Sequence, residues 1–510
     1  MKTKTTMMMM MNKKIFFAVF FAFALTLSAS SQASELTDAA NNDWLELVRK
    51  YSSEDKIIKI KTDDIDSKWN RLIKNSSENK SENEEDDFLS EWQQIFNDEV
   101  LTDLIKSAFK SNRDLISSRA KVLEARAALG IVRTDFGVKP DFNAGYTNGR
   151  NSDFEDDEEK SYNKYSVGFD ASWEIDFWGR KKHEFEAAKA NLESENAEHE
   201  NAKLSLASEV AMNYFNLRVL QKRLEIAENN LASQNELLEI LKSQLKSGLA
   251  DETSLKQLQS ETEMNRAKIP EIKKSLNQTM NAIAILTGAI PKSIDGKLSQ
   301  NSKEKIFPDI EISKFIGIPA ETLKQRPDIR AAERKFAAQI QKRKAAEKSI
   351  YPVIQLTGAI GFESSSTGNL FSSGSYTYSI GPALKWPIFN MKEIRKNIQV
   401  QSAIEEQLLA EFEDVILKAV GEVHDALDAN VQEISRNEFL KKALENANEN
   451  FEIAKNKYSN GLINFADVLK VQQEVFSIKD EFVSSEGQKF INLIALLKSL
   501  GGEKRVGSRK

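Results

Sequence analysis

The residues of this sequence best suited to metal binding or acid–base catalysis are its three histidines, His183, His199 and His424. Their spacing matches no metal-ligand pattern, and the chain contains no HExxH, P-loop or GxSxG motif. There is no cysteine, so we expect no disulfide, no thiolate ligand and no lipidation of an N-terminal cysteine. We therefore expect no enzyme, no catalytic site, no metal site and no cofactor.

Polar residues elsewhere follow a regular pattern rather than the spacing of a catalytic or metal site. Between residues 165 and 175, polar residues alternate with apolar ones. The apolar positions are Tyr165, Val167, Phe169, Ala171, Trp173 and Ile175. A period of two indicates a strand with one apolar and one polar face. Eleven strand residues span about 36 Å, which is enough to cross a bilayer at a tilt.

The polar face of this strand determines the charge of a lumen if the apolar face points outward. Asp170, Glu174 and Asp176 then face the lumen or its rim. Their main opposing charge is Lys385, so we expect the lumen to favour cations.

The alternating pattern returns 213 residues later, because 165–175 matches 378–388 at Tyr, Ser, Gly, Trp and Ile without a gap. Each strand has an alternating partner, over 141–149 and 353–362. Aromatic residues toward the strand ends suit a girdle at the membrane interface. The girdle residues would be Tyr165, Trp173, Tyr378 and Trp386. A soluble half-buried sheet shows the same alternation, and only the signal peptide and the long helices favour the membrane.

The N-terminus predicts that the protein is exported from the cytoplasm. A basic region with Lys2, Lys4, Lys13 and Lys14 precedes the apolar run 15–27 and the small-residue site "SQA". This pattern indicates a signal peptide over residues 1–33, with a membrane anchor as the alternative. No later run of eighteen apolar residues exists, so any further membrane passage must use strands.

The offset of 213 residues recurs along most of the chain and predicts an internal duplication. "SGL" at 247–249 answers "NGL" at 460–462, and Gly288 answers Gly501. Each half is predicted to contain a helix, a strand pair, a very long helix and a shorter return helix. The expected divisions are an extension over 34–87, a first repeat over 88–290, a connector over 291–325, a second repeat over 326–502 and a tail over 503–510.

Two exceptionally long helices are the main feature of each half. Residues 180–247 contain no internal Gly or Pro, and residues 391–460 contain only Gly421. Such helices are roughly 100 Å long and indicate coiled-coil packing rather than a globular core. Return helices are expected over 253–286, with Pro270 as a break or kink, and over 465–500. The mildly acidic net charge of −6 argues against a nucleic-acid partner.

At this point the chain resembles the TolC/OprM family of outer-membrane efflux channels. The resemblance covers about residues 88–502 and is most specific in the run RPDIRAAE. The matching stretches are FNDEVLTDLIKSAFKSNRDL (96–115), WEIDFWGR (173–180), LASEVAMNYFNLR (206–218), IPAETLKQRPDIRAAE (318–333), YPVIQLTGAIG (351–361), GPALKWPIFN (381–390) and NGLINFADVLKVQQ (460–473). RPDIRAAE itself is best explained structurally, because Pro327 begins a helix and Asp328 occupies its first turn.

The resemblance implies an α+β membrane protein that works as a homotrimer. Three chains would form a 12-stranded transmembrane β-barrel, with four strands each, continuous with a periplasmic α-helical barrel. Physics supports this independently, because four strands cannot close a barrel and eight leave no lumen. The family further implies a passive outer-membrane duct that exports drugs and toxic compounds. Its partners would be a periplasmic adaptor and an inner-membrane pump.

The resemblance also implies two kinds of site at the helical tips. Adaptor docking is expected at Ser247, Gly248, Leu249, Asn460, Gly461 and Leu462. A periplasmic gate is expected at Asp467 and Lys470, although a lysine at 470 departs from the aspartate of many relatives. Solvated helix-surface charges explain these two residues equally well.

Two alternatives to an efflux duct remain at this stage. The first is the outer-membrane duct of a type I protein secretion system, which would have the same fold. The second is a secreted coiled-coil scaffold without a pore. A heat-resistant β-sheet signal in detergent and a trimer band would separate a duct from a scaffold.

Overall fold

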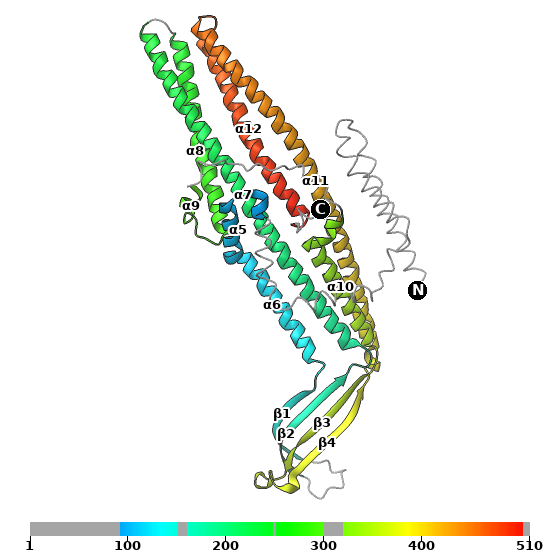
Figure 1. Ribbon diagram of the computed structural model, residues 1–510. Helices are drawn as coiled ribbons and strands as arrows, with labels where there is room; N and C mark the ends of the chain where they lie inside the picture. The colour runs from blue at the N-terminus through cyan, green and yellow to red at the C-terminus, as the bar shows by residue number, and fades with distance from the viewer. Residues whose placement is uncertain (1–91, 151–160, 248–250, 300–319, 503–510) are drawn as a thin grey trace, which may run out of the picture. The chain divides into compact units, whose positions relative to one another are not determined.

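The structure is a computed structural model, and it describes residues 92–150, 161–247, 251–299 and 320–502. The predicted signal peptide, extension and C-terminal tail lie outside the described residues, as do Gly248 and Leu249. Residues 88–310 and 322–510 belong to one structural unit. All the long elements described below lie in this unit (Figure 1).

The order of elements repeats within the chain, as the duplication predicts. A short helix, α5 (Glu99–Ser111), precedes the first repeat. The first repeat contains α6 (Arg113–Thr134), β1 (Lys139–Arg150), β2 (Ser161–Ile175), α7 (Arg180–Lys246) and α8 (Glu252–Leu286). The second contains α10 (Pro327–Lys348), β3 (Val353–Ser364), β4 (Tyr376–Lys385), α11 (Met391–Ser459) and α12 (Phe465–Ser499). Between them lie α9 (Asp295–Ser299) and a 3₁₀ turn at Ala320–Gln325.

The helix lengths confirm the prediction of two very long helices. The α7 helix has 67 residues and α11 has 69, so each is about 100 Å long. The α8 and α12 return helices have 35 residues each. The α8 helix runs through Pro270 without ending there. Among the described residues, no helix is both long enough and apolar enough to cross a membrane.

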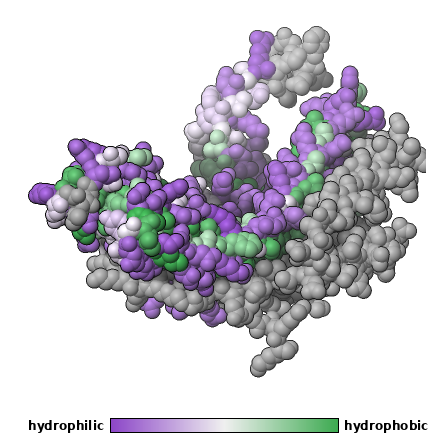
Figure 2. Space-filling view, turned by 90° about the horizontal axis from the view of Figure 1, so that it is seen from above, coloured by the Kyte–Doolittle hydropathy of each residue, from purple (hydrophilic) through white to green (hydrophobic). Residues whose placement is uncertain are grey.

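The helices lie side by side with α7 at the centre (Figure 1). Near the sheet the neighbours follow the order α6, α7, α10 and α11. Toward the far ends of the helices the order becomes α8, α7, α12 and α11. Seen from the end of the helices, the described surface is mostly hydrophilic with smaller hydrophobic patches (Figure 2). In both orders of neighbouring helices, α6 or α8 stands at one edge of the layer and α11 at the other.

The largest buried side chains gather where α5 and α12 meet the middle of α7. Tyr214 and Phe215 are fully buried. The ring of Phe215 lies 4.8 Å from that of Phe490 on α12 and 5.5 Å from that of Phe96. The hydroxyl of Tyr214 donates to the Asp98 carboxylate that caps α5. Aromatic packing thus joins the two repeats at this level.

The four strands form one antiparallel sheet in the order β1, β2, β3, β4. Its register places apolar residues opposite one another, with Phe169 between Phe142 and Ile360. The strand predicted to reach residue 388 ends at Lys385 instead. Pro387 has no N–H to donate to a ladder, and a 3₁₀ turn follows at Ile388–Asn390.

Glycine makes the sharp turn at the end of β2. Gly179 has φ of +80°, a left-handed conformation that strains other residues. It directly precedes Arg180, the first residue of α7. The end of the predicted strand at residue 175 and the start of the predicted long helix at residue 180 are confirmed.

Candidate functional site

The apolar face of the sheet is uncovered in the chain. Phe142 is 62% exposed, Tyr378 73% and Ile380 73%. A soluble sheet buries such a face against a helix or a second sheet. In the described chain, the sheet contacts helical elements only weakly and at its ends. The face is therefore available to lipid or to another copy of the chain.

The four predicted girdle aromatics lie on the uncovered sheet or at its end. Trp173 and Trp386 lie where the helices begin, and their indole nitrogens donate to the carbonyls of Phe136 and Ile350, at 2.9 and 3.1 Å. Tyr165 lies farther from the helices and packs against Tyr146 with the two rings tilted and their centroids 4.8 Å apart. Tyr378 is opposite Ile360 in the register. Their contact with a membrane interface stays a prediction.

The three predicted lumen acids differ in their partners. Glu174 pairs with Arg180 at 2.5 Å and with Lys181 at 3.6 Å. The Asp176 carboxylate accepts backbone hydrogen bonds from Lys181 and Lys182, at 3.2 and 2.9 Å, at the start of α7. These two acids are thus engaged at the turn, and the cations that compensate Glu174 are local ones rather than Lys385.

Asp170 is different, because within the described residues its carboxylate has no cationic partner. It accepts a hydrogen bond of 2.5 Å from the Asn143 amide. The register places Asp141 directly opposite Asp170 on the same face. Sequence reasoning missed Asp141, although alternation along β1 places it on the face opposite to Phe142. The two carboxylates carry the negative charge of the polar face.

The end of α11 has the conformation expected for the predicted docking tip. Gly461 has φ of +70°. Leu462 donates its N–H to Lys457 and Gly461 donates to Tyr458, each at 2.9 Å, which is a Schellman motif. The Leu462 side chain is 72% exposed. Asn460 is the C-cap residue of α11.

The equivalent tip of the first repeat is described only up to Ser247. The Ser247 hydroxyl donates to the Ser243 carbonyl at 3.1 Å and its N–H caps the end of α7. Gly248 and Leu249 lie outside the described residues. Docking at either tip stays a prediction.

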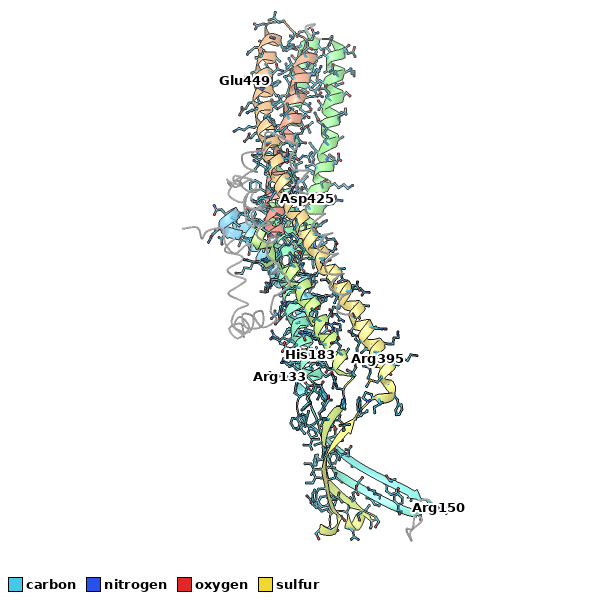
Figure 3. The ribbon with its side chains drawn as sticks, turned by 90° about the vertical axis from the view of Figure 1, so that its right-hand side faces the viewer. Arg133, Arg150, His183, Arg395, Asp425 and Glu449 are labelled. Atoms are coloured by element: carbon cyan, nitrogen blue, oxygen red, sulfur yellow. The ribbon has the colours of Figure 1, made fainter. Side chains whose placement is uncertain are left out.

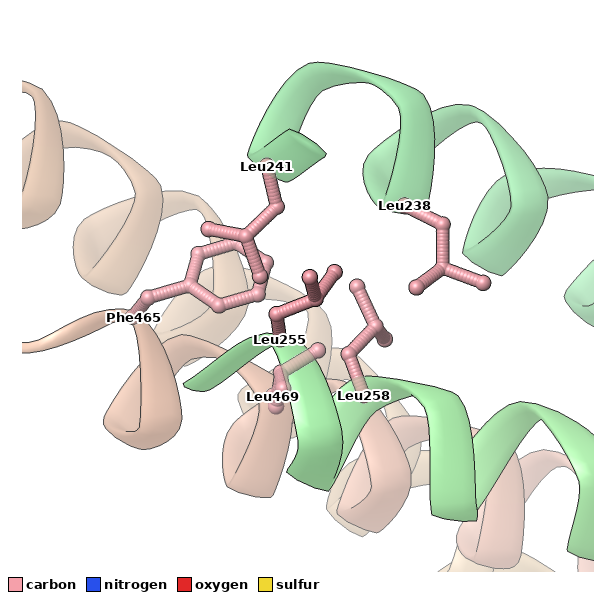
Figure 4. Packing of buried hydrophobic residues seen from close by; sticks show 6 residues of the cluster. All are labelled: Leu238, Leu241, Leu255, Leu258, Phe465 and Leu469. Carbon is pink, nitrogen blue, oxygen red and sulfur yellow. The ribbon is translucent and has the colours of Figure 1, made fainter. Parts of the chain in front are cut away.

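The two tips are held together by an apolar cluster (Figure 4). The cluster joins α7 and α8 to α12 and consists of Leu238, Leu241, Leu255, Leu258, Phe465 and Leu469. Tyr458 on α11 packs against it and donates its hydroxyl to Gln244 at 3.2 Å. The hairpins of the two repeats thus form one packed tip.

The predicted gate residues lie in the first turns of α12. The Asp467 carboxylate accepts the backbone N–H of Asn464 at 3.2 Å, and the Asn464 side chain accepts from the backbone of Asp467. This capping box gives Asp467 a structural role. Lys470 is exposed, and within the described chain it forms no ion pair with Asp467. A gate at these residues stays a prediction.

On the α11 side, small and polar residues form the contact between α11 and α12. The buried residues of α11 are Ala419, Ala426, Asn430, Asn437, Ala447 and Ala454. The Asn430 side chain donates to the Asn492 carbonyl at 2.9 Å, and the Asn492 side chain donates to the Ala429 carbonyl at 3.0 Å. Seven-residue spacing along α11 is typical of a coiled coil. The hairpin is thus specified by hydrogen bonds as well as by apolar packing.

The RPDIRAAE run forms a junction between helices, and its first residue was missed by sequence reasoning. Arg326 is buried, and Pro327 begins α10 as predicted. The guanidinium pairs with Asp328 and Glu422, each at 2.7 Å. It also donates to the carbonyl of Ser499 at the end of α12, at 2.7 Å. An arginine before the helix-starting proline was the only signal in the sequence.

A family model described as outer membrane efflux protein matches residues 104–289 and 318–502. These two segments hold both copies of the repeated elements and well over half of the chain. The chain belongs to the outer membrane efflux protein family. Family membership decides against a secreted scaffold without a pore.

Relatives of this efflux protein agree in fold and in length. It is 28% identical over 411 residues to the cation efflux system protein CusC of Escherichia coli O6:H1, covering 81% of this chain and 88% of CusC. It is 28% identical over 422 residues to the toluene efflux pump outer membrane protein TtgF of Pseudomonas putida, covering 81% of this chain and 85% of TtgF.

Solved structures agree as well. The outer-membrane channel OprN superposes with a TM-score of 0.75 at 27% identity, covering 81% of this chain and 92% of OprN. The Campylobacter jejuni CmeC outer membrane channel gives a TM-score of 0.73 at 25% identity, covering 81% and 87%. The predicted α+β channel fold, outer-membrane location and efflux function are confirmed.

Proposed function

We propose that three copies of this efflux protein form a passive duct through the outer membrane. The observation that carries the proposal is a four-stranded sheet with an uncovered apolar face and two unpaired edge strands, β1 and β4. In lipid every backbone N–H and C=O must find a partner. Edge-to-edge pairing of β1 with β4 of the next copy satisfies both edges.

The number of copies follows from the size of the closed sheet. Eight strands from two copies enclose an interior that side chains fill. Twelve strands from three copies leave a lumen. The polar face, with Asp141 and Asp170, would then line the lumen, and the apolar face would meet lipid.

The helical layer supports association of the same kind. Its α6 edge exposes the apolar residues Ile116, Leu123 and Ile131, which are 45%, 55% and 67% exposed. Its α11 edge exposes Val400, Leu417, Val431, Phe439 and Ile453. These apolar side chains give both edges of the layer surface that another copy can bury. In a ring of three copies, the α6 and α8 edge of one would cover the α11 edge of the next.

The remaining parts of the proposal concern partners and cargo. We propose that the duct carries out no catalysis, needs no cofactor and depends on an energised inner-membrane pump. A periplasmic adaptor would dock at the helical tips, where Gly461 lacks a side chain and Leu462 is exposed. The names of the relatives, which include cation efflux and toluene efflux, favour small ions or small molecules over a secreted protein.

The lipid-facing side of β4 offers a direct test with a matched control. Ile380 and Ser379 are neighbours on β4 and point to opposite faces. Arginine on a lipid-facing strand position costs about 2–4 kcal/mol near the bilayer midplane. We expect Ile380→Arg to lower the yield of trimer in outer-membrane fractions on unheated gels, while Ser379→Arg assembles and conducts in planar bilayers. Equal assembly of the two variants would contradict a lipid-facing β4.

A further inference from the structure

A cluster of exposed aromatic side chains marks the junction between the sheet and the long helices. This aromatic cluster consists of Phe177, Trp178, Tyr351, Trp386 and Phe389. The Trp178 ring stacks on Tyr351 at 4.7 Å and meets Phe177 at 4.8 Å. Phe389 is fully exposed. Of these side chains only Trp386 was among the predicted girdle residues. The indole N–H of Trp178 donates to the Pro352 carbonyl at 2.8 Å, which joins the turn after β2 to the start of β3.

Three cations lie directly beyond this cluster in the first two turns of α11. They are Lys392, Arg395 and Lys396, and all three are exposed. Lys396 donates to the uncharged amide of Gln399 at 2.9 Å. Within the described ranges, none of the three forms an ion pair. Figure 3 shows Arg395 on the part of α11 near the sheet, on the side turned away from the other helices.

The helix itself does not account for these cations. The N-terminal end of a helix carries partial positive charge and favours acidic residues there, by about 0.3–1 kcal/mol for each charge. Glu393 is the only acidic residue in the first turn of α11. The first turn of α7, which is equivalent in the other repeat, has no acidic residue. There, however, Arg180 pairs with Glu174 and Glu184.

A neighbouring copy does not supply an obvious anion at this level either. The α6 edge, which would face α11 in the proposed trimer, ends with Arg133 at about the same height as Arg395 (Figure 3). Asp135 follows, but it is already paired with Lys139 at 2.6 Å. The three cations of α11 therefore form a positive surface that is open to an anion from outside the protein.

We propose that this junction binds the headgroups of anionic phospholipids. The aromatic cluster would lie among the headgroups and the upper acyl chains, where aromatic rings are favoured. Lys392, Arg395 and Lys396 would then reach the phosphate layer from its water side. The inference rests on the proposed passage of the sheet through the membrane. The aromatic cluster and the three cations continue the uncovered apolar face of the sheet, and their positive charge complements the negative charge of the lipid phosphates.

Native mass spectrometry of the full-length protein, titrated with phosphatidylglycerol and with phosphatidylcholine, tests this site. The test variant is Lys392→Gln/Arg395→Gln/Lys396→Gln. The control variant, Lys441→Gln/Lys442→Gln/Lys457→Gln, removes three exposed cations from the same helix farther from the sheet. Each cation near an anionic surface contributes roughly fivefold in affinity. We expect the ratio of the affinity for phosphatidylglycerol to that for phosphatidylcholine to fall at least fivefold in the test variant and to stay unchanged in the control variant.

Three results would overturn the proposal: no preference for phosphatidylglycerol in the unmodified protein, full retention in the test variant, or equal losses in both variants. The last result would indicate general charge attraction or an inter-copy contact rather than this junction. Trimer assembly and conductance in phosphatidylcholine bilayers are measured in parallel. If the test variant still assembles and conducts there while losing its lipid preference, the junction is supported. If the unmodified protein assembles and conducts but shows no preference for phosphatidylglycerol, only this inference fails and the proposed duct stands.

Discussion

Asn112 and Arg326 are the N-cap residues of α6 and α10, and each donates a side-chain hydrogen bond to the end of the return helix of its own repeat. Asn112 reaches the Leu286 carbonyl at 3.0 Å, and Arg326 reaches the Ser499 carbonyl at 2.7 Å. The two carbonyls lie 213 residues apart in the chain. Different side chains therefore make the same connection in both repeats.

Loss of the Arg326 guanidinium should destabilise the helical layer. Arg326→Ala leaves Asp328 and Glu422 without their partner, and breaking a buried ion pair in this way costs about 3–5 kcal/mol. Because Glu422 is 58% exposed, we expect the lower end of this range. Thermal unfolding followed by circular dichroism in detergent measures the effect. As a control, Arg330→Ala removes an exposed pair with Glu200 and should cost less than about 1 kcal/mol. Equal costs for the two variants would refute a special role for Arg326.

Alanine at Gly421, inside α11, and alanine at Gly461, just after its C-cap, should change stability in opposite directions. Gly461→Ala forces a side chain into a left-handed conformation and should cost about 1–2 kcal/mol. Gly421 lies inside the same helix with open space around it, so Gly421→Ala should stabilise by about 0.5–1 kcal/mol. Chemical denaturation of the two variants would show whether the signs differ as expected.

A bulky residue at position 461 should separate docking from folding. Gly461→Phe places a ring in open space at the tip, so we expect trimer assembly and bilayer conductance to persist. Export and crosslinking to the adaptor should be lost, because the approach to the helix end is blocked. Gly374→Phe, in the loop before β4, places the same ring in open space and should leave export unchanged. Normal export by the Gly461→Phe variant would show that this tip is not a docking surface.

The facing carboxylates of β1 and β2 should determine ion selectivity. Removing both charges with Asp141→Asn/Asp170→Asn should lower the cation-to-anion permeability ratio toward one at low salt. Asn143→Ala removes the hydrogen bond to Asp170 but no charge, and should keep the preference. At 1 M salt, screening over about 3 Å should weaken the preference in every variant. Anion preference of the unmodified channel at low salt would contradict a lumen lined by this face.

The place of Asp467 in the capping box affects how a gate at this residue should be tested. Asp467→Asn removes the charge but keeps an oxygen for the Asn464 N–H, so the start of α12 is retained. Combined with Lys470→Gln, it should raise resting conductance if attraction between these charges helps to close the channel. Asp467→Ala also removes the bond that Asp467 accepts in the capping box, while the Asn464 side chain still accepts from the backbone of residue 467. Unchanged conductance in the Asn/Gln variant would favour a purely structural role.

Burial of Glu486 on α12 should make stability depend on pH. Desolvation raises the pKa of its carboxyl above the ordinary value of 4.5, while Lys489 and Lys441 oppose this shift only in part. A raised pKa favours the protonated form in the folded state, so this contribution is complete below pH 4.5 and is lost as pH rises through the folded-state pKa. Glu486→Gln should therefore raise the melting temperature at pH 7 and change it little at pH 4. A lower melting temperature at pH 7 would indicate that the charged form is stabilised.

Local patterns of the sequence determined the elements and their repetition. Alternation with a period of two is a property of neighbouring residues, so the strand 165–175 and its apolar face were predicted before the fold was known. The end of the second long helix near residue 460 was predicted for a similar reason, because Gly461 follows it and only glycine adopts a left-handed turn without strain. The end of β4 was wrong by three residues, since Pro387 interrupts the ladder despite the continuing alternation.

Only the tertiary structure decided which charges are compensated and which are free. Alternation in the sequence places Glu174 and Asp170 on the same polar face. The turn after β2 brings Arg180 into contact with Glu174, but it brings no cation to Asp170. Asp141 joins Asp170 through strand pairing, and Arg326 meets Ser499 across 173 residues of chain. An ion pair or a hydrogen bond depends on separations of a few ångströms. Such distances arise from the packing of elements that lie far apart in the sequence, and no local period encodes them.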